Sequence, residues 1–458
     1  MSINNAIIDC LVENNVTALF GIPGKQSLPL NESISERDDI RFVMARHETA
    51  VSHQAWGYAE TSGEMAGTVV IPGPGDMNAM NGLTNALNDC TPILHVAVET
   101  EPEVRGGDGI HETPPDTYDN VVKRNVTVET PQGTIAELQR AIDVARTTPK
   151  GPVRVGIPKN FLEMDVTLAE RSKTEERTVA GVPEEKIEAA ADSLADASRP
   201  IVIAGGGTRT SGASDELIAV AERLAAPVVV TYKGKATFPD DHGLMGGVLC
   251  GGTGTELKSL IADADTALAV GTDFDAVSFH RWSIDVPEDL IHITVTASDI
   301  GTGYDPAIGI VTDAAEALSS LDDALAERTI SGDTGLDRAR ETRAATDDRL
   351  EELGGVTEAP LTSVAALNAI REGTPRDAVV AVDAGGFRLW TLLTFSAYDP
   401  RNYVNPGSWA TMASGVPSAI GAKVANPEQD VVALTGDGGL LMCVHELHML
   451  ADENIDMT

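Results

Sequence analysis

Aromatic residues, cysteines and basic residues are all scarce in this chain of 458 residues. Phenylalanine, tryptophan and tyrosine together make up 4% of it, which argues against large aromatic binding platforms. The four cysteines (Cys10, Cys90, Cys250 and Cys443) lie far apart and form no CxxC pair. Neither a zinc site nor a disulfide framework is therefore indicated, and a reducing compartment is favoured.

Long apolar runs are also lacking. The apolar runs are of strand length, far shorter than a membrane span requires. Met1 leads into a polar amphipathic stretch, with no basic region followed by an apolar one, so no secretory signal is indicated. We expect a soluble protein of the cytoplasm.

Positive charge is in short supply, because 33 basic residues face 70 acidic ones and the formal net charge is -37. Such a surface repels phosphate backbones and anionic lipids, so we expect no nucleic acid and no membrane as partner. The acidic residues are spread along the chain and are not collected in a tail. A spread acidic surface suits a salt-rich cytosol, where screening reduces self-repulsion, and we expect a halophilic source.

Strand-like apolar runs alternate with helical patterns along most of the chain, which predicts α/β layers with parallel sheets. The length suits three domains. Two charged stretches of weak periodicity, 168–183 and 327–360, are interpreted as linkers, although part of the second can be helical. We expect three doubly wound parallel-sheet domains, at 1–165, 184–325 and 358–458.

The third of these domains ends abruptly. Thr362 is expected to cap its first helix, and a strand at 431–435 and a helix at 440–450 follow later. Asn454-Ile455-Asp456 then has the character of a turn before a further strand, and the sequence stops at Thr458. This end would leave a buried sheet edge unpaired, so we expect a carboxyl-terminal part to be missing and the third domain to be incomplete.

The pattern Gly436-Asp437-Gly438-Gly439 lies between a predicted strand and a predicted helix. Between two strands an Asp-Gly pair would indicate a hairpin turn, but in a doubly wound sheet this loop lies where ligands bind. Glycines let backbone N–H groups approach a diphosphate, and an aspartate supplies the oxygen ligand that Mg²⁺ prefers. Taken alone, the pattern is still more often a plain turn.

Three further patterns are weaker. Arg46-His47-Glu48 precedes a helix, where an acidic residue favours the dipole and His47 can act as a cap. Gly73-Pro74-Gly75-Asp76-Met77-Asn78 is a strand-to-helix turn whose glycines permit close approach to a ligand. Gly205-Gly206-Gly207 ends the run IVIAGGG before a helix expected near Asp215, but the GxGxxG spacing is not met. A Rossmann dehydrogenase is therefore a rival class with a poor signal.

Together and in this order, these patterns resemble the thiamine-diphosphate superfamily, closest to acetolactate synthase large subunits. The match includes FGIPG at 20–24, GYA at 57–59 and TMASGVPSAIGAK at 411–423. The resemblance implies an enzyme that uses thiamine diphosphate and Mg²⁺ to decarboxylate pyruvate and join the product to a second 2-oxo acid. The alternatives are a decarboxylase or oxidase of the same superfamily, or a non-catalytic truncated relative.

The resemblance also assigns roles to residues. Glu48 matches the glutamate that hydrogen-bonds the aminopyrimidine ring, Asp437 the metal ligand, and Met412 the residue that holds the cofactor bent. Other cofactor-binding positions are implied at Gly24, Gly75, Asn78, Gly385, Gly386, Phe387, Gly436, Gly438 and Gly439. The family places Glu48 of one subunit against Asp437 of another, which implies a homodimer or homotetramer acting on small 2-oxo acids.

Some matching positions differ from the family. Its Phe-Gln-Glu element is Ile110-His111-Glu112 here, so His111 is either a proton shuttle or, as we favour, a loop residue, and its Gly-Gln is Val98-Glu99. The flavin-binding stretches become Asp273-Phe274-Asp275 and HITVT at 292–296, so FAD is a doubtful cofactor. A second metal-ligand asparagine and a carboxyl-terminal lid would fall beyond Thr458.

The charge excess gives the first testable prediction. Carboxylates that are unscreened repel one another, so lowering the salt concentration is expected to unfold the protein. Circular dichroism during stepwise dialysis from molar salt into dilute buffer measures this. Full retention of the folded signal in dilute buffer would contradict the halophilic interpretation.

Overall fold

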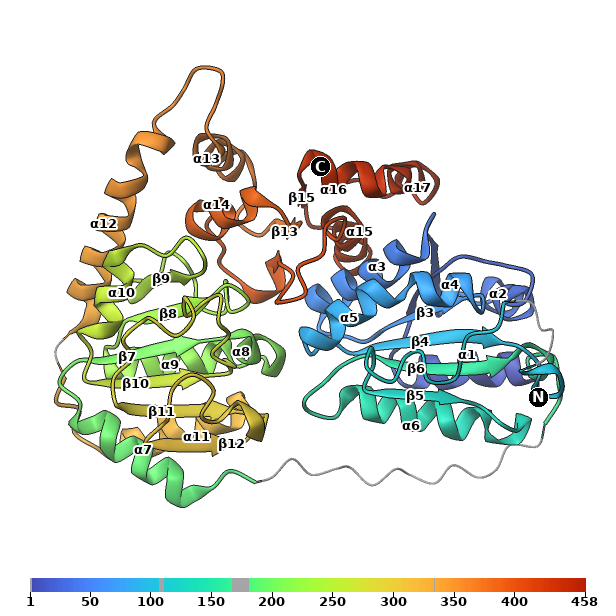
Figure 1. Ribbon diagram of the computed structural model, residues 1–458, viewed down its shortest axis with the longest axis horizontal. Coiled ribbons are helices and arrows are strands. Elements are labelled where there is room, and N and C mark those ends of the chain that lie inside the picture. The colour runs from blue at the N-terminus through green and yellow to red at the C-terminus, as the bar shows by residue number, and fades with distance from the viewer. Residues whose placement is uncertain (1, 107–110, 167–180, 333) are drawn as a thin grey trace. The chain divides into compact units, whose positions relative to one another are not determined.

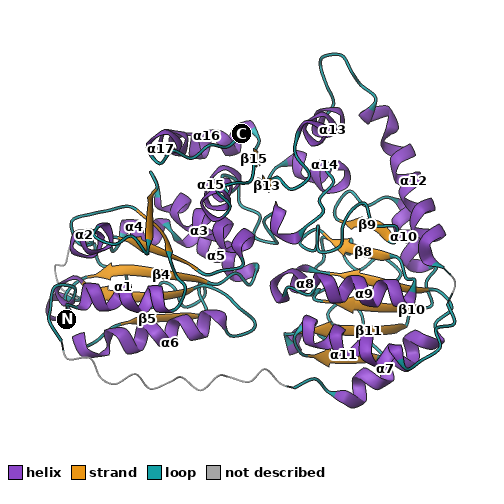
Figure 2. Cartoon of the chain, turned by 180° about the vertical axis from the view of Figure 1, so that it is seen from behind, coloured by secondary structure: helices purple, strands orange, loops and turns teal. Residues whose placement is uncertain are grey.

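The computed structural model describes residues 2–106, 111–166, 181–332 and 334–458. Its described residues form two compact units (Figure 1). The first unit contains those of 1–177 together with 379–385 and 404–458. The second contains 178–378 and 386–403. Each unit is built from parallel strands with helices on their faces, as Figure 2 shows.

The first unit contains a six-stranded parallel sheet of order β2-β1-β3-β4-β6-β5. Its strands are β1 (Ala18–Gly21), β2 (Arg41–Met44), β3 (Ala66–Val70), β4 (Ile93–Glu99), β5 (Arg124–Thr127) and β6 (Val153–Pro158). Its helices are α1 (Ile3–Glu13), α2 (Leu28–Ser35), α3 (Glu48–Ser62), α4 (Pro74–Asn78), α5 (Met80–Asn88) and α6 (Thr134–Arg146). One apolar cluster joins the sheet to α1, α2 and α6, and another joins it to α3 and α5. Strands buried on both faces have near-continuous apolar sequences, which is why their runs were visible in the sequence.

The second unit contains another six-stranded parallel sheet, of order β12-β11-β10-β7-β8-β9. Its strands are β7 (Pro200–Ala204), β8 (Val228–Thr231), β9 (Met245–Leu249), β10 (Thr266–Val270), β11 (Asp289–Thr294) and β12 (Ile308–Val311). Its helices are α7 (Glu184–Asp196), α8 (Gly206–Ser211), α9 (Ser214–Leu224), α10 (Thr255–Ala262) and α11 (Ala314–Ala326). Alternate residues of β7 enter two different apolar clusters, so this sheet is also covered on both faces.

Helices α12 (Gly335–Gly354), α13 (Ser363–Gly373) and α14 (Gly386–Thr394) complete the second unit. The structure differs from the linker expected at 327–360, because α12 lies against β9, α10 and α13 and buries Ala339 and Leu350. A long helix with few apolar residues is held here by a narrow buried face. The predicted cap at Thr362 is confirmed, since its hydroxyl accepts the N–H of Ala365. Most of the other predicted linker, 168–183, lies outside the described residues.

A three-stranded sheet of order β14-β13-β15 carries the carboxyl-terminal part of the chain. Its strands are β13 (Val379–Val382), β14 (Tyr403–Val404) and β15 (Val431–Leu434), and the helices are α15 (Gly415–Ala425), α16 (Asp437–Cys443) and α17 (Leu447–Asp452). The single helix predicted at 440–450 is wrong, because a 3-10 turn at Val444–Glu446 separates α16 from α17. Beyond α17, Thr458 exchanges backbone hydrogen bonds with Val431 and Ala433 at the free edge of β15. The α/β class with parallel sheets is confirmed, and the three domain boundaries stay a prediction.

The contact between α3 and α15 joins the amino-terminal and carboxyl-terminal segments of the first unit. Two glycines permit it. A Cβ atom on Gly57 would lie 2.7 Å from the carbonyl carbon of Ser418, and one on Gly421 would lie 2.8 Å from the carbonyl carbon of Gln54. The two backbones therefore approach as closely as glycine allows.

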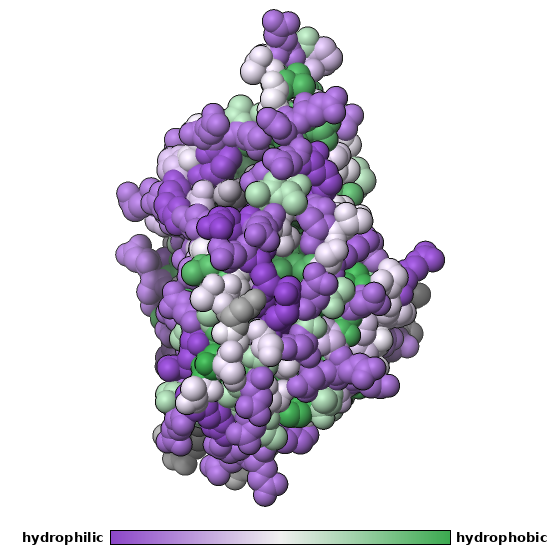
Figure 3. Space-filling model, turned by 90° about the vertical axis from the view of Figure 1, so that its left-hand side faces the viewer, coloured by the Kyte–Doolittle hydropathy of each residue, from purple (hydrophilic) through white to green (hydrophobic). Residues whose placement is uncertain are grey.

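Within the described part of the chain, no helix is both long and apolar enough to cross a membrane. The face drawn in Figure 3 is mostly hydrophilic, with apolar side chains scattered over it. That distribution agrees with the large excess of acidic residues.

Substituting Gly421→Ala should test the α3–α15 contact. The added methyl group would overlap the backbone of α3, so we expect a loss of about 2 kcal/mol or more in unfolding free energy, despite the better helix propensity of alanine. Gly373→Ala is the matched control, because nothing lies within 4 Å of a Cβ atom there. Urea denaturation in high salt measures the unfolding free energy of both variants. Equal values for the two would contradict the close contact between α3 and α15.

Candidate functional site

Three of the predicted cofactor residues follow neighbouring strands of the first sheet. Gly24 follows β1, Glu48 follows β2 and Gly75 follows β3, and β1 pairs with both β2 and β3. Parallel strands bring their carboxyl ends to one edge of a sheet, where ligands bind in open α/β folds. Gly24 and Gly75 both approach the side chain of Ile71, so the loops after β1 and β3 lie together.

Glu48 is the first residue of α3 and is partly buried. Its Oε2 atom accepts a hydrogen bond of 3.0 Å from Nδ2 of Asn78. A Cβ atom on Gly75 would lie 3.1 Å from Oε1 of Glu48, so glycine lets the turn approach this carboxylate. The capping role considered for His47 is confirmed, because its Nδ1 atom accepts the N–H of Thr49 at 3.2 Å. The structure thus brings Glu48, Gly75 and Asn78 together as predicted site residues.

The backbone just before Glu48 is held by a carboxylate from the carboxyl-terminal segment. Glu446 is fully buried, and its two carboxylate oxygens accept the N–H of Arg46 at 3.0 and 3.2 Å. Nε2 of Gln54 donates to the same carboxylate at 3.3 Å. Burial raises the pKa of Glu446 to about 7, although the backbone N–H groups of Arg46 and His47 oppose this rise. No role for Glu446 was indicated by the sequence.

Asp383, also missed by sequence reasoning, connects three segments at the carboxyl end of β13. It is fully buried, and its carboxylate accepts the N–H groups of Ala413 at 3.2 Å and Ser414 at 3.1 Å. The hydroxyl of Thr435 donates to it at 2.8 Å, and a Cβ atom on Gly439 would lie 3.1 Å from its Cγ. An aspartate directly after the buried run VVAV was the signal available in the sequence.

The loop that carries Met412 adopts an unusual backbone. Ala410 and Ala413 have φ angles of 45° and 67°, in the left-handed region that disfavours residues other than glycine. Such residues cluster at functional sites and persist where their surroundings hold them, as the Asp383 carboxylate holds the N–H of Ala413. A Cβ atom on Gly438 would lie 2.9 Å from Cε of Met412, so this side chain reaches the predicted diphosphate loop.

Asp437 is exposed at the start of α16, after Gly436. In the ranges that the structure describes, no three His, Cys, Asp or Glu side chains gather as a metal site. One exposed carboxylate fits Mg²⁺ bound through a single protein oxygen, with phosphate oxygens and water as the other ligands. The residues present therefore fit a metal that arrives with a diphosphate.

Gly385, Gly386 and Phe387 are consecutive residues at the boundary between the two units. Gly385 belongs to the first unit, whereas Gly386 and Phe387 begin α14 in the second. Both glycines are exposed, and a Cβ atom on Gly386 would meet nothing within 4 Å. Their role in binding the diphosphate stays a prediction.

Family models match three parts of the chain. The N-terminal TPP binding domain of thiamine pyrophosphate enzymes matches residues 1–120, the central domain 187–321, and the C-terminal TPP binding domain 383–458. A probable acetolactate synthase large subunit of Methanocaldococcus jannaschii is 30% identical over 98% of this chain and 78% of its own length.

The chain belongs to the thiamine pyrophosphate enzyme family. The acetolactate synthase large subunit of Lactococcus lactis is 30% identical over 97% of this chain and 77% of its own length. A probable 2-ketoarginine decarboxylase of Pseudomonas aeruginosa is 31% identical over 99% and 80%. The resemblance to acetolactate synthase large subunits is confirmed. The chain spans 77 to 80% of the length of these relatives, and the expectation of a missing carboxyl-terminal part stays a prediction.

A buried charged cluster supports the glycine turn of this thiamine pyrophosphate enzyme. Asp76 accepts hydrogen bonds from Thr113 at 2.7 Å, His95 at 2.8 Å and Arg154 at 2.6 Å, and Arg154 also pairs with Glu99. Burial raises the pKa of Asp76, but His95 and Arg154 outweigh it and hold this pKa well below its usual range. Burial raises the pKa of Glu99, although the nearby charge of Arg154 lowers it. The sequence marked Asp76 only as a turn residue.

His111 lies beside the same turn through its backbone. A Cβ atom on Gly73 would lie 2.8 Å from Cα of His111, and the His111 side chain is exposed. Ile110, which was expected to matter with it, lies outside the described residues. Whether His111 shuttles protons therefore stays a prediction.

The glycine run after β7 does not make a cradle for a flavin dinucleotide. The N–H of Gly205 donates to Val270 and that of Gly207 to Gly271, at 2.8 and 2.7 Å. These glycines allow two backbones to pack, since a Cβ atom on Gly205 would lie 2.7 Å from the carbonyl carbon of Gly271. Burial and the nearby carboxylate of Asp275 raise the pKa of Asp273 at the same sheet edge. The amides of Gly205 and Gly207 therefore already have backbone partners and are not free to bind a diphosphate.

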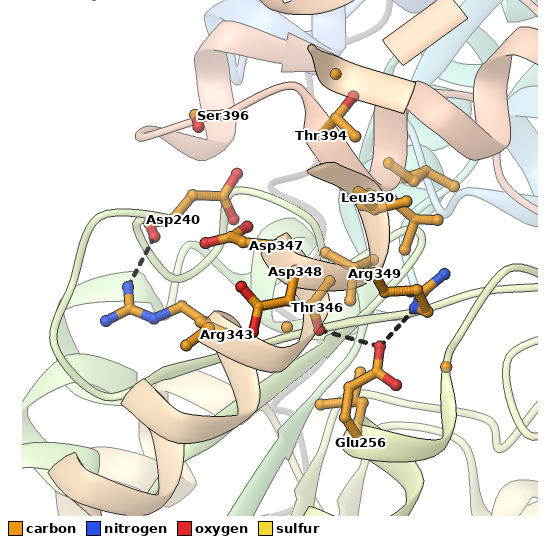
Figure 4. A pocket seen from close by; sticks show the side chains of 18 of the residues that line it. Asp240, Glu256, Arg343, Thr346, Asp347, Asp348, Arg349, Leu350, Thr394 and Ser396 are labelled. Carbon is orange, nitrogen blue, oxygen red and sulfur yellow. Dashed lines mark hydrogen bonds and ion pairs between the residues drawn. The ribbon is translucent and has the colours of Figure 1, made fainter. Parts of the chain in front are cut away.

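A cavity of about 850 Å³ lies in the second unit, beside α12 (Figure 4). No residue predicted for the cofactor lines it. Several of its polar side chains bond to other groups of its walls, because Arg349 and Thr346 donate to Glu256 at 2.8 and 3.2 Å, and Arg343 reaches backbone carbonyls (Figure 4). The cavity is therefore a polar space beside a charged helix.

Asp383→Asn should weaken both the fold and the predicted site. A buried amide presents N–H groups where Ala413, Ser414 and Thr435 donate, so we expect unfolding free energy to fall by about 2 to 4 kcal/mol. Asp399→Asn, at an exposed 3-10 turn, is the control. Chemical denaturation in high salt measures the two, and an unchanged midpoint for Asp383→Asn would contradict the connecting role.

Proposed function

We propose that this chain decarboxylates a 2-oxo acid, with pyruvate the expected substrate, and joins the product to a second 2-oxo acid, as acetolactate synthases do. The observation that carries the proposal is the arrangement of the first unit. Glu48, with Gly75 and Asn78, is fixed to the carboxyl-terminal segment, which also holds Met412 and Asp437. The named relatives support the same activity.

The side chains of this site suit the binding of thiamine diphosphate and Mg²⁺. Bound thiamine diphosphate would supply a C2 carbanion that adds to the 2-oxo acid, and a thiazolium ring that accepts the electrons of the cleaved carbon–carbon bond. Glu48 would hold the aminopyrimidine ring by a hydrogen bond, with Asn78 orienting its carboxylate. Asp437 would bind the metal, while the glycines from Gly436 to Gly439 let backbone N–H groups approach the diphosphate. Met412 would exclude water and support the bent cofactor.

A simple decarboxylase is the second candidate. The Pseudomonas aeruginosa relative named as a probable 2-ketoarginine decarboxylase matches this chain at 31% identity, similar to the synthases. An oxidase of the family or a non-catalytic relative would keep the same fold. The product formed from pyruvate separates these functions, because acetolactate indicates carboligation and acetaldehyde indicates simple decarboxylation.

A homodimer or homotetramer is part of the proposal. Exposed apolar side chains occur on the segments that carry Met412 and Asp437, and larger exposed apolar patches mark association sites. They are Trp409, Met412, Leu441, Met442, Val444 and Leu447. We propose in addition that the protein works in a salt-rich cytoplasm, in keeping with its net charge and with four cysteines that form no CxxC pair.

Calorimetric titration with thiamine diphosphate, in high salt with Mg²⁺, tests the site. Asp437→Ala is expected to abolish binding, because the metal loses its protein ligand, whereas Glu48→Gln largely keeps it, because the diphosphate contacts remain. Asp456→Ala, an exposed aspartate of the same segment, is the control and should bind as the unaltered protein does. Binding that survives Asp437→Ala, or none by the folded unaltered chain, would refute the assigned site.

A further inference from the structure

The amino end of α3 is held from two directions, and this arrangement bears on Glu48. Asn78 holds the Glu48 side chain, and Glu446 holds the backbone directly before it. Glu446 is fully buried although it is a carboxylate, and such residues are costly unless they are bonded. Its partners are backbone N–H groups of Arg46 and His47, the amide of Gln54 and, at 3.4 Å, the Nε2 atom of His445.

We propose that Glu446 is a positioning residue, which sets the direction of Glu48 by fixing the Arg46–His47 backbone to the carboxyl-terminal segment. A helix amino end leaves N–H groups without partners, and a carboxylate placed there fixes the entry of the chain. A change of the backbone at His47 would move Glu48, the next residue, relative to Asn78. The inference rests on the proposed function only in that Glu48 acts on thiamine diphosphate.

The 3-10 turn between α16 and α17 places Glu446 against the backbone before α3. The segment from Asp437 to Asp452 is not one continuous helix, because the 3-10 turn at Val444–Glu446 interrupts it. The residues around Glu446 in the chain are exposed, namely Val444, His445 and Leu447. Glu446 alone of this turn is fully buried.

The titration of Glu446 should be visible near neutral pH. The pKa of about 7 is raised from the ordinary 4.5, so the proton is bound more tightly in the folded protein. The stability from this proton is present below pH 4.5 and lost as pH rises through about 7. The N–H groups of Arg46 and His47, in contrast, are held best by the ionised carboxylate, which predominates above this pH. Other titratable or charged groups near this carboxylate are Arg46, His47, Glu48, Asp383, Cys443, His445, His448, Asp452 and Glu453.

Hydrogen–deuterium exchange of the whole chain without cofactor is the first experiment. Peptides that cover residues 44–50 should exchange about tenfold faster in Glu446→Gln, because one oxygen facing donors becomes an N–H₂ group. The melting temperature should change little at pH 8, since loss of a buried charge offsets the lost bonds. Glu453→Gln is the matched control, because this carboxylate accepts the N–H of Met44 at 3.3 Å from a solvent-accessible position. It should exchange within about twofold of the unaltered protein.

The pH profile separates positioning from packing. In the unaltered protein, the protection of these amides, corrected for intrinsic exchange, should rise between pH 5.5 and 8.5, whereas in Glu446→Gln it should not. His445→Gln should keep the rise, which excludes the adjacent histidine as its source. The proposal would be overturned if His445→Gln abolished the rise in protection. It would also be overturned if amides throughout the Glu446→Gln protein exchanged faster and its melting temperature fell.

The second experiment uses thiamine diphosphate and Mg²⁺. Glu446→Gln should bind the cofactor within about threefold of the unaltered protein, but exchange its C2 proton with D₂O about tenfold more slowly, because Glu48 is misdirected. Equal proton exchange in Glu446→Gln and the unaltered protein would overturn the proposal. Absence of binding by the unaltered chain would refute the proposed function instead, and the cofactor-free exchange would still decide whether Glu446 fixes the turn.

Discussion

The close packing of α3 on α15 is the contact on which the rest of the candidate site depends. It joins a helix that begins with Glu48 to the segment that carries Met412 and Asp437. Gly57 and Gly421 make it possible, since any side chain there would meet the opposite backbone. Once the two helices are in contact, the loops at the carboxyl ends of β2 and β15 share one unit, and the Glu446 carboxylate can bond to Arg46.

Buried carboxylates then fix the loops that the sheets bring together. Asp383 connects the end of β13 to the Met412 loop and to Thr435, and Asp76 anchors the turn that faces Glu48. A buried charge is a weak contributor to stability, but it fixes geometry because its bonds are strongly directional and costly to break. The candidate site is therefore shaped by buried aspartates and glutamates for which the sequence indicated no cofactor-binding role.

The exposed acidic residues and these buried ones act in different ways. The net charge of -37 governs the solubility of the protein and the dependence of its stability on salt, because salt ions screen exposed charges. The few buried carboxylates act through specific N–H groups and hydroxyls. Net charge therefore could not point to Asp383 or Glu446, which look like ordinary members of an acidic sequence.

The class of fold and the motifs were readable from the sequence, with clear exceptions. The strand predicted at 431–435 is β15, and the apolar part of the run IVIAGGG is β7, which is buried on both faces. Helix α12 was not predicted as part of a packed unit, because its few buried residues lie among charged ones. The predicted helix at 440–450 failed at Val444–Glu446, where a tertiary contact with α3 outweighs local propensity.

What the sequence determined by itself is the set of chemical groups: the glycine turns, the Arg46-His47-Glu48 and Gly436–Gly439 motifs, and the order that marks the family. These depend on residue type and local spacing, which a sequence displays directly. The tertiary structure decided which of these groups meet, and it added Asp383, Glu446 and the Asp76–Arg154 pair as the residues that hold them. The reason is physical, because these hydrogen bonds join residues 30, 78 and 400 positions apart and depend on the packing of sheets and helices, which no local pattern records.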